Sequence, residues 1–171
     1  MSAFMKFADL TLALAKLLTI LIIATMVFSV LVGVFFRFII PIPMAWPPEL
    51  ARFLMVAVTM IGASVAIRQL DHVGITLLVD ALPVRVRGVI YIFGNIMVAV
   101  FLAVFTWFSW RLTLEMGPRQ TSSSLGVNMA FAYAAMPIGG VMMLIQIIAV
   151  SIEGWQRTLE NQSPFVPPPG A

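Results

Sequence analysis

Residues 17–36 read LLTILIIATMVFSVLVGVFF, a run of twenty residues without an ionisable side chain. Lys16 precedes the run and Arg37 follows it. At about 1.5 Å of rise per residue, a helix of this length spans about 30 Å, the thickness of the hydrocarbon core of a bilayer. The stretch therefore predicts a transmembrane helix. We do not expect a cleaved signal peptide, because the apolar run is too long and no small-x-small cleavage site follows it.

Three more apolar runs are long enough to cross a bilayer. We expect the second helix over 50–67, after Pro47 and Pro48, because proline lacks the N–H that has no partner in a first helical turn. The third is expected over 88–110, with aromatic residues at both ends as is typical of membrane interfaces.

Residues 125–152 are uncharged over more length than one straight crossing needs. We expect the fourth helix to cover 129–152, with Asn128 as its N-cap. Pro137, followed by two glycines, is expected to bend it.

The composition agrees with a membrane protein, since 61% of the 171 residues are hydrophobic and only 10% are charged. A soluble domain carries roughly 25% charged residues and could not hide this much apolar surface. The predicted fold is an all-α integral membrane protein of four transmembrane helices. The absence of cysteine excludes disulfides and thiolate metal sites, and the single histidine excludes a haem held by two histidines.

The connecting segments predict two short interfacial helices. Residues 2–16 place charged side chains on one stripe and large apolar ones broadly opposite, which suits a surface-lying helix or an extension of the first membrane helix. Residues 71–82 form a second, less regular amphipathic pattern. We expect residues 1–160 to form a single membrane domain and the proline-rich residues 161–171 to be disordered.

The positive charges predict the orientation. An even number of crossings puts both termini on one side, which would carry six of the ten Lys and Arg residues. Cytoplasmic loops are richer in Lys and Arg, so we expect both termini in the cytoplasm. The residues that we expect to have a structural role on that side are Arg68, His72, Asp80, Arg85 and Arg87.

Ionisable residues on the opposite side form the main candidate site. Glu49 and Arg52 are three residues apart, so they share a helical face and can pair, and Arg37 lies close by across a short turn. One interpretation is an interfacial ion cluster that keeps Arg52 at the headgroup boundary. The other is a docking point for a partner protein, formed by Arg37, Trp46, Glu49 and Arg52.

Other polar groups give no sign of catalysis. Arg111 and Glu115, four residues apart, read as a solvated helix end. His72 and Asp80 are too few for a metal site. Ser122, Ser123 and Ser124 have no histidine partner and read as a loop. We therefore expect no catalytic, cofactor-binding or metal site, and no nucleic-acid partner because no basic stripe with interleaved aromatic residues is present.

The order of several short motifs resembles the small permease subunits of TRAP transporters, the DctQ type. The segment from Trp46 to Phe53 matches the Trp-x-x-Glu-x-x-Arg pattern that opens their second helix. Further matching segments are Gly62-Ala63, Arg68, Asp71-His72-Val73, Val79 to Pro83 with Arg85 and Arg87, Leu125-Gly126-Val127, and Tyr133 to Gly139. The resemblance covers roughly 17–155. At six positions the residue differs from the one that such subunits commonly have, so contacts typical of the family are not expected there. These positions are Pro48, Gly74, Thr76, Asn128, Ala130 and Phe131.

The resemblance implies a tripartite ATP-independent periplasmic secondary transporter (symporter) of organic acids in a bacterial inner membrane. In such systems a periplasmic solute-binding protein captures the substrate, and a large permease subunit carries the substrate and ion sites. The small subunit would brace the large one, contribute to docking of the binding protein, and contact membrane lipid.

Two other functions remain open on the residues alone. A self-sufficient four-helix ion-coupled exporter would need a carboxylate embedded in a helix, and the central parts of the predicted helices have none. A membrane assembly or anchor factor outside transport would need no such group.

Overall fold

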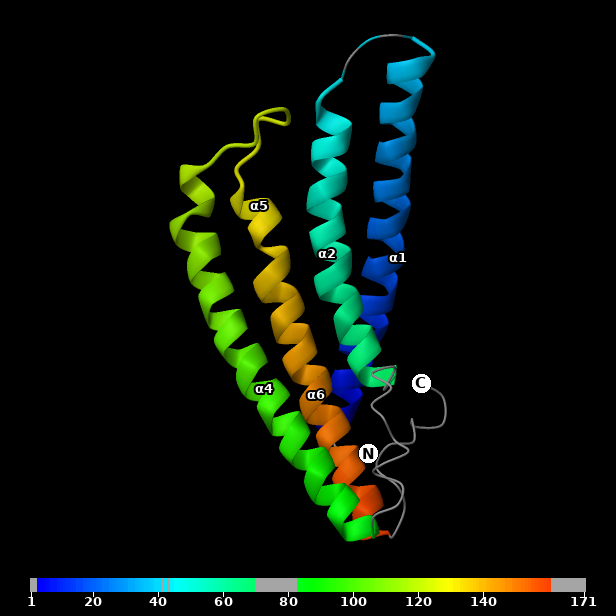
Figure 1. The fold of residues 1–171 in the computed structure, drawn as a ribbon, viewed down its shortest axis with the longest axis vertical. Coiled ribbons are helices and arrows are strands. Elements are labelled where there is room, and N and C mark those ends of the chain that lie inside the picture. Colours follow the sequence, from blue (N-terminus) through cyan, green and yellow to red (C-terminus); the bar gives the residue numbers. More distant parts are fainter. Residues whose placement is uncertain (1–2, 41, 43, 70–82, 161–171) are drawn as a thin grey trace.

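The computed structural model describes residues 3–40, 42, 44–69 and 83–160. Within these residues the fold is helical, apart from one isolated bridge between Thr121 and Asn128. The elements are α1 (Ala3–Phe38), α2 (Trp46–Gln69), α4 (Val84–Glu115), the 3-10 turn η1 (Gly117–Arg119), α5 (Ala130–Tyr133) and α6 (Ala135–Leu159) (Figure 1). In this part of the chain four helical segments are long and apolar enough to cross a membrane, as predicted.

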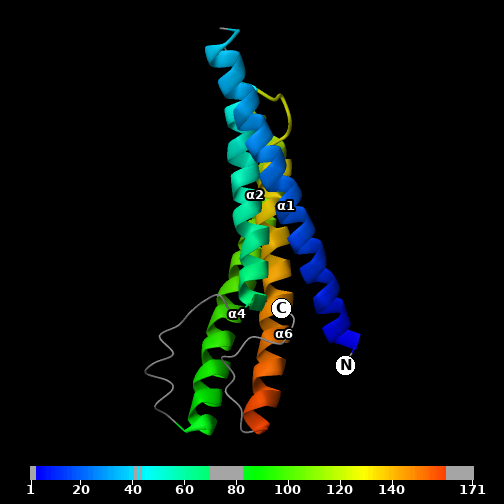
Figure 2. The ribbon, with the colours of Figure 1, turned by 90° about the vertical axis from the view of Figure 1, so that its right-hand side faces the viewer.

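The long helices lie side by side in the order α4, α6, α2 and α1, so they form a row rather than a closed bundle (Figure 1). The central helix, α6, packs against both α4 and α2, and α1 packs mainly against α2. A view from the side shows α1 inclined across its neighbours (Figure 2). Large parts of each helix therefore remain uncovered by the chain itself.

The first helix extends far beyond the predicted apolar run. At 36 residues, α1 is about 54 Å long, which exceeds the hydrocarbon thickness. Of the two arrangements considered for residues 2–16, the structure therefore shows the extension of the first membrane helix. The predicted helix at 71–82 and the tail at 161–171 lie outside the described residues, as do His72 and Asp80.

Mostly small residues of α1, and not its large apolar side chains, pack the start of the helix against its neighbours. Phe7, Leu10 and Leu14 are exposed. The residues buried on the opposite face are Ala8, Thr11, Leu12 and Ala15. Short side chains let helix backbones approach closely, which is how helices pack in a membrane where burial of apolar groups gives no extra driving force.

The fourth membrane segment is interrupted where the sequence predicts a bend. The helix breaks at Ala134, between α5 and α6. Pro137 has no N–H to donate to the carbonyl four residues earlier, so the helical ladder is weakened here. The N-cap is Met129, one residue after the predicted Asn128, although the side-chain oxygen of Asn128 does accept a 2.8 Å hydrogen bond from the backbone N–H of Ala130.

Glycines on α6 allow both neighbouring helices to approach it closely. A Cβ atom placed on Gly139 would lie 2.6 Å from the Cβ of Met60 on α2 and 2.8 Å from the Met60 carbonyl carbon. A Cβ on Gly154 would collide with the ring of Tyr91 on α4. Between these two levels, the buried core combines Ile67, Leu102, Met143 and Ile147 from three helices.

We predict that Gly139→Ala lowers the stability of the fold, whereas Gly94→Ala does not. The added methyl group at Gly139 would meet the Met60 backbone, and overpacking of this kind costs about 1–3 kcal/mol. Nothing lies within 4 Å of a Cβ on Gly94, which makes it a matched control on α4. Thermal unfolding in detergent, followed by tryptophan fluorescence, measures the difference. Equal unfolding temperatures for the two variants would contradict the packing described for α2 and α6.

Candidate functional site

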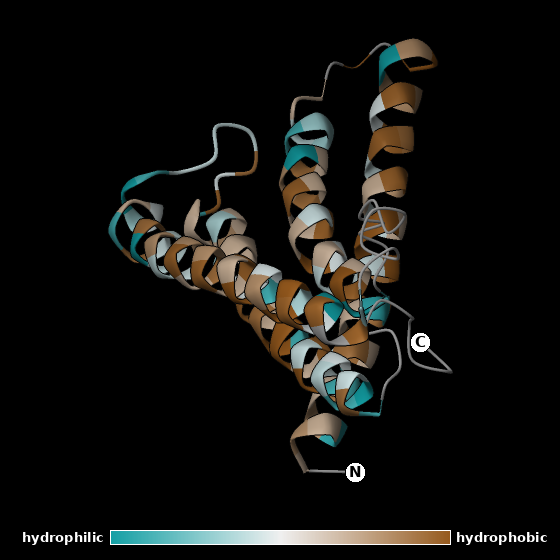
Figure 3. Ribbon diagram, turned by 60° about the horizontal axis from the view of Figure 1, so that its bottom comes forward, coloured by the Kyte–Doolittle hydropathy of each residue, from teal (hydrophilic) through white to brown (hydrophobic). Residues whose placement is uncertain are grey.

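The charged side chains of the described residues lie outside the long apolar runs of the helices. Colouring by hydropathy shows the apolar residues along the helices and the polar ones toward their ends (Figure 3). We call the end with the α1–α2 connection and the α4–α5 loop the turn end, and the end with Ala3 and Leu159 the termini end. Within the described residues, 17–36, 53–67, 88–110 and 135–152 contain no ionisable Asp, Glu, Lys, Arg or His side chain.

At the turn end, the last turns of α1 are joined to the first turn of α2. The hydroxyl of Ser29 donates a 3.0 Å hydrogen bond to the carbonyl oxygen of Pro47, and both residues are buried. Gly33 lies one turn further along α1, where a Cβ would come 3.2 Å from the Cβ of Pro47. Two small residues on α1 thus make room for the proline ring that opens α2.

The α4–α5 connection forms a small hairpin-like loop at the same end (Figure 1). Ser122 N–H donates to the Val127 carbonyl at 2.8 Å, and Met129 N–H donates to the Gln120 carbonyl at 3.0 Å. Gly126 adopts a φ of 66°, which L side chains rarely adopt, so glycine is needed to close the loop. The predicted serine loop is therefore an ordered structure.

Glu49 connects α2 to this loop. Its carboxylate accepts a 2.8 Å hydrogen bond from the backbone N–H of Ser124. Glu49 also lies in the first turn of α2, where a negative charge interacts favourably with the helix dipole. The carboxylate of Glu49 therefore links α1–α2 to α4–α6 at the turn end through charge-assisted hydrogen bonding to the loop.

The structure brings all four predicted docking residues to the turn end but does not pair them as expected. Among the described residues, no ion pair joins Glu49 to Arg52 or Arg37, so the predicted Glu49–Arg52 pair is wrong. Arg52 is exposed, and Arg37 lies over the ring of Phe38 at 5.8 Å. The carboxylate turns toward the loop because Ser124 N–H lies within hydrogen-bonding distance of it. Trp46 is the first residue of α2 and is partly buried.

The pair predicted at the end of α4 does form. Arg111 and Glu115 lie 2.8 Å apart, and each side chain is 56% exposed. This agrees with a solvated helix end.

A buried arginine at the termini end forms two ion pairs that the sequence analysis did not predict. Arg68 Nη2 lies 3.0 Å from Asp9 Oδ1 and 2.7 Å from Glu153 Oε1. The arginine side chain is only 5% exposed, against 43% for Asp9 and 23% for Glu153. One guanidinium thus connects α1, α2 and α6, which is consistent with the structural role expected of Arg68.

Gln146 lies two turns before Glu153 on α6 and is completely buried. Its side-chain nitrogen donates 2.9 Å hydrogen bonds to the Ala8 carbonyl and to the Thr11 hydroxyl. A buried amide in an apolar environment is costly unless it is hydrogen-bonded, so this contact fixes where α1 crosses α6.

Sequence reasoning missed the ion pairs of Arg68 because their members are far apart in the chain. Arg68 is 59 residues from Asp9 and 85 from Glu153. A usable signal was present, since Asp9 and Glu153 are acidic residues close to the ends of apolar helices on the side where Arg68 ends α2. Arg87 and the backbone of Arg85 lie in the first turn of α4, near the same end.

The described residues contain no group of three or more His, Cys, Asp or Glu side chains that could hold a metal ion. Glu49, Arg68 and Gln146 link helices or loops through one or more of their polar atoms, while Arg68 Nη1 and Gln146 Oε1 are buried without a hydrogen-bond partner. The arrangement suits a scaffold with two polar surfaces more than a reaction centre.

Residues 26–157 match the family model for the DctQ component of tripartite ATP-independent periplasmic transporters. The chain belongs to this DctQ family. The match covers most of the described structure, from the middle of α1 to the last turn of α6.

Curated relatives of this DctQ chain carry matching names. The sialic acid TRAP transporter permease protein SiaT of Haemophilus influenzae is 31% identical over 62% of this chain but only 17% of its own length. The small permease protein SiaQ of Vibrio cholerae is 26% identical over 64% of this chain and 63% of its own. The C4-dicarboxylate small permease protein DctQ of Rhodobacter capsulatus is 29% identical over 70% of this chain and 52% of its own. The aligned region thus spans less than two thirds of each relative.

We predict that Arg68→Gln destabilises this DctQ chain far more than Arg111→Gln does. Removing a buried partner leaves the other charges unpaired at a cost of about 3–5 kcal/mol, and the partial exposure of Asp9 and Glu153 reduces this to about 2 kcal/mol. Arg111 belongs to an exposed pair worth about 0.3–0.5 kcal/mol.

Both variants remove one arginine, but Arg68 is buried and pairs with two carboxylates, whereas Arg111 is exposed and pairs with one. Unfolding by denaturant in mixed micelles gives the two free energies. Equal losses would show that Arg68 does not hold the helices together.

Proposed function

We propose that this chain is the small membrane subunit of a TRAP secondary transporter, in which it braces a large permease subunit and contributes to docking of a periplasmic solute-binding protein. The proposal includes an inner-membrane location with both termini in the cytoplasm, so that the turn end faces the periplasm. The transported solute would be an organic acid, in keeping with the sialic acid and C4-dicarboxylate named for the relatives.

The observation that carries the proposal is the apolar middle of the row. Coupled transport through the chain itself would require polar or charged groups at membrane depth. The apolar runs 17–36, 53–67, 88–110 and 135–152 contain no Asp, Glu, Lys, Arg or His side chain, and the fully buried amide nitrogen of Gln146 is bonded to α1. The same observation does not favour a self-sufficient exporter, which would need an embedded carboxylate.

The open row supports permanent association with a larger protein. Few residues of three membrane segments are buried within the chain: 6% in the most apolar window of α1, and 17% in those of α2 and α4, against 44% in the central segment Ala130–Leu159. In SiaT the matching region makes up 17% of a longer permease chain, so there the equivalent segment is covalently joined to additional sequence. In this fused relative the two parts stay together in equal number, which supports a stable association here.

The turn end has the features of a docking surface. Glu49 and the α4–α5 loop hold each other in place, and Arg52 is exposed beside them. Charged groups on a surface steer the encounter with a partner more than they stabilise the fold.

Co-purification tests the central proposal. The tagged chain, extracted from its native membrane in mild detergent, should retain a large permease in equal amount, and reconstitution of both should be needed for solute uptake dependent on the binding protein. Uptake by either subunit alone, or the absence of a large permease from the purified material, would contradict it.

We predict that Arg52→Glu reduces uptake by the complete system roughly fivefold to tenfold by weakening docking, as expected when about 1–1.4 kcal/mol of interaction is lost. Arg52 makes no ion pair among the described residues, so the fold should not change. Lys6→Glu reverses an exposed charge at the termini end and serves as the control. Uptake is measured with varied amounts of binding protein. An effect that is equal in both variants, or that excess binding protein does not relieve, would exclude a docking role for Arg52.

A further inference from the structure

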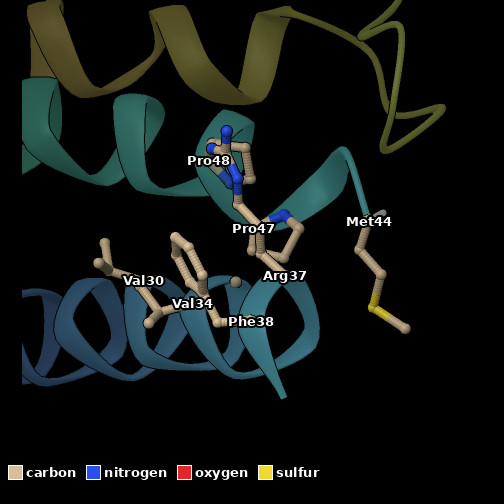
Figure 4. Close-up of a pocket in the computed structure, with 8 residues that line it drawn as sticks. Val30, Val34, Arg37, Phe38, Met44, Pro47 and Pro48 are labelled. Atoms are coloured by element: carbon tan, nitrogen blue, oxygen red, sulfur yellow. The ribbon is translucent and has the colours of Figure 1, made fainter. Parts of the chain in front are cut away.

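A groove of about 450 Å³ opens between the last turns of α1 and the first turn of α2. Figure 4 shows it at close range, with side chains from both helices and from their connection facing it. The apolar residues that line it include Val30, Val34, Phe38, Met44, Pro47 and Pro48. The groove is distinct from the Glu49–Ser124 contact, since neither of these two residues lines it.

Arg37 is the one charged residue that lines the groove in the described part of the chain. Its side chain extends from α1 toward Pro48 (Figure 4). Within the described residues no carboxylate pairs with it, and its nearest aromatic contact is the adjacent Phe38. The nearest acidic residue of α2, Glu49, is hydrogen-bonded to Ser124 instead. The site therefore offers one uncompensated positive charge above an apolar surface.

The depth of the groove matches the boundary between headgroups and hydrocarbon. Arg37 directly follows the uncharged run 17–36, so it lies where that run leaves the apolar core. Val30 lies seven residues earlier, about 10 Å deeper along the helix. A ligand that fills the groove must therefore be anionic at one end and apolar over at least this length.

We propose that this groove binds a phospholipid, with its phosphate at Arg37 and an acyl chain over Val30 and Val34. Arginine is well suited to phosphate, because its guanidinium can donate two parallel hydrogen bonds to the phosphate oxygens. A carboxylate side chain of a protein partner would satisfy the charge but would leave the apolar length of the groove unfilled. The bound lipid would fill the space between α1 and α2 beside the Ser29–Pro47 contact.

Native mass spectrometry of the full chain, titrated with palmitoyl-oleoyl phosphatidylglycerol in detergent, tests the proposal. Arg37→Gln removes the charge, and Val34→Trp fills the groove while leaving Arg37 in place. Arg119→Gln is the control, because it removes another exposed arginine at the turn end that does not line the groove. Circular dichroism verifies that each variant is folded.

We expect the tightest lipid adduct to weaken up to about fivefold in Arg37→Gln, as for the loss of a partly exposed charge pair, and to weaken also in Val34→Trp. Arg119→Gln should bind as the unmodified chain does. Retention of the adduct by both groove variants, or an equal loss in Arg119→Gln, would overturn the proposal. So would an Arg37→Gln variant that keeps its lipid but no longer retains a large permease, since Arg37 would then bind protein. Because lipid binding by the chain alone is measured, this test is independent of the transport function.

Discussion

The high cost of placing a charge in hydrocarbon is the constraint on which the structure depends. Every backbone polar group must be satisfied within a helix, and every charged side chain of the described residues lies outside the apolar runs 17–36, 53–67, 88–110 and 135–152. Arg68 meets this constraint in an unusual way, because a nearly buried guanidinium is neutralised by Asp9 and Glu153 from two other helices. The contact determines where three helices meet and leaves the apolar middle to be organised by glycines and small side chains.

The polar groups at the two ends of the helix row have different roles. At the termini end, Arg68 and Gln146 are buried and connect helices, so they act on the fold. At the turn end, Arg37 and Arg52 are exposed and make no ion pair within the described chain, so they are available to ligands outside it. The absence of charged groups from the central apolar runs of the described residues agrees with the proposal that this chain acts through its surfaces.

The sequence was sufficient to predict the four helices, the interruption near Pro137 and the Arg111–Glu115 pair. These features depend on local spacing or on the length of an apolar run, both of which are visible in one chain. It was not sufficient to predict that Glu49 bonds to Ser124 rather than Arg52, or that Asp9 reaches Arg68. Those contacts depend on how the helices are arranged in the row, which a pattern of residue types does not specify.

The uninterrupted course of α1 has a mechanical consequence. No proline or break divides Ala3–Phe38, and the helix is fixed near one end by Asp9 and near the other by the contact of Ser29 with Pro47. A straight helix held near both ends tilts as one unit. A displacement of α1 at Asp9 would therefore change the position of Arg37 at its opposite end. The result is a mechanical link, along one helix, between the two ends of the row.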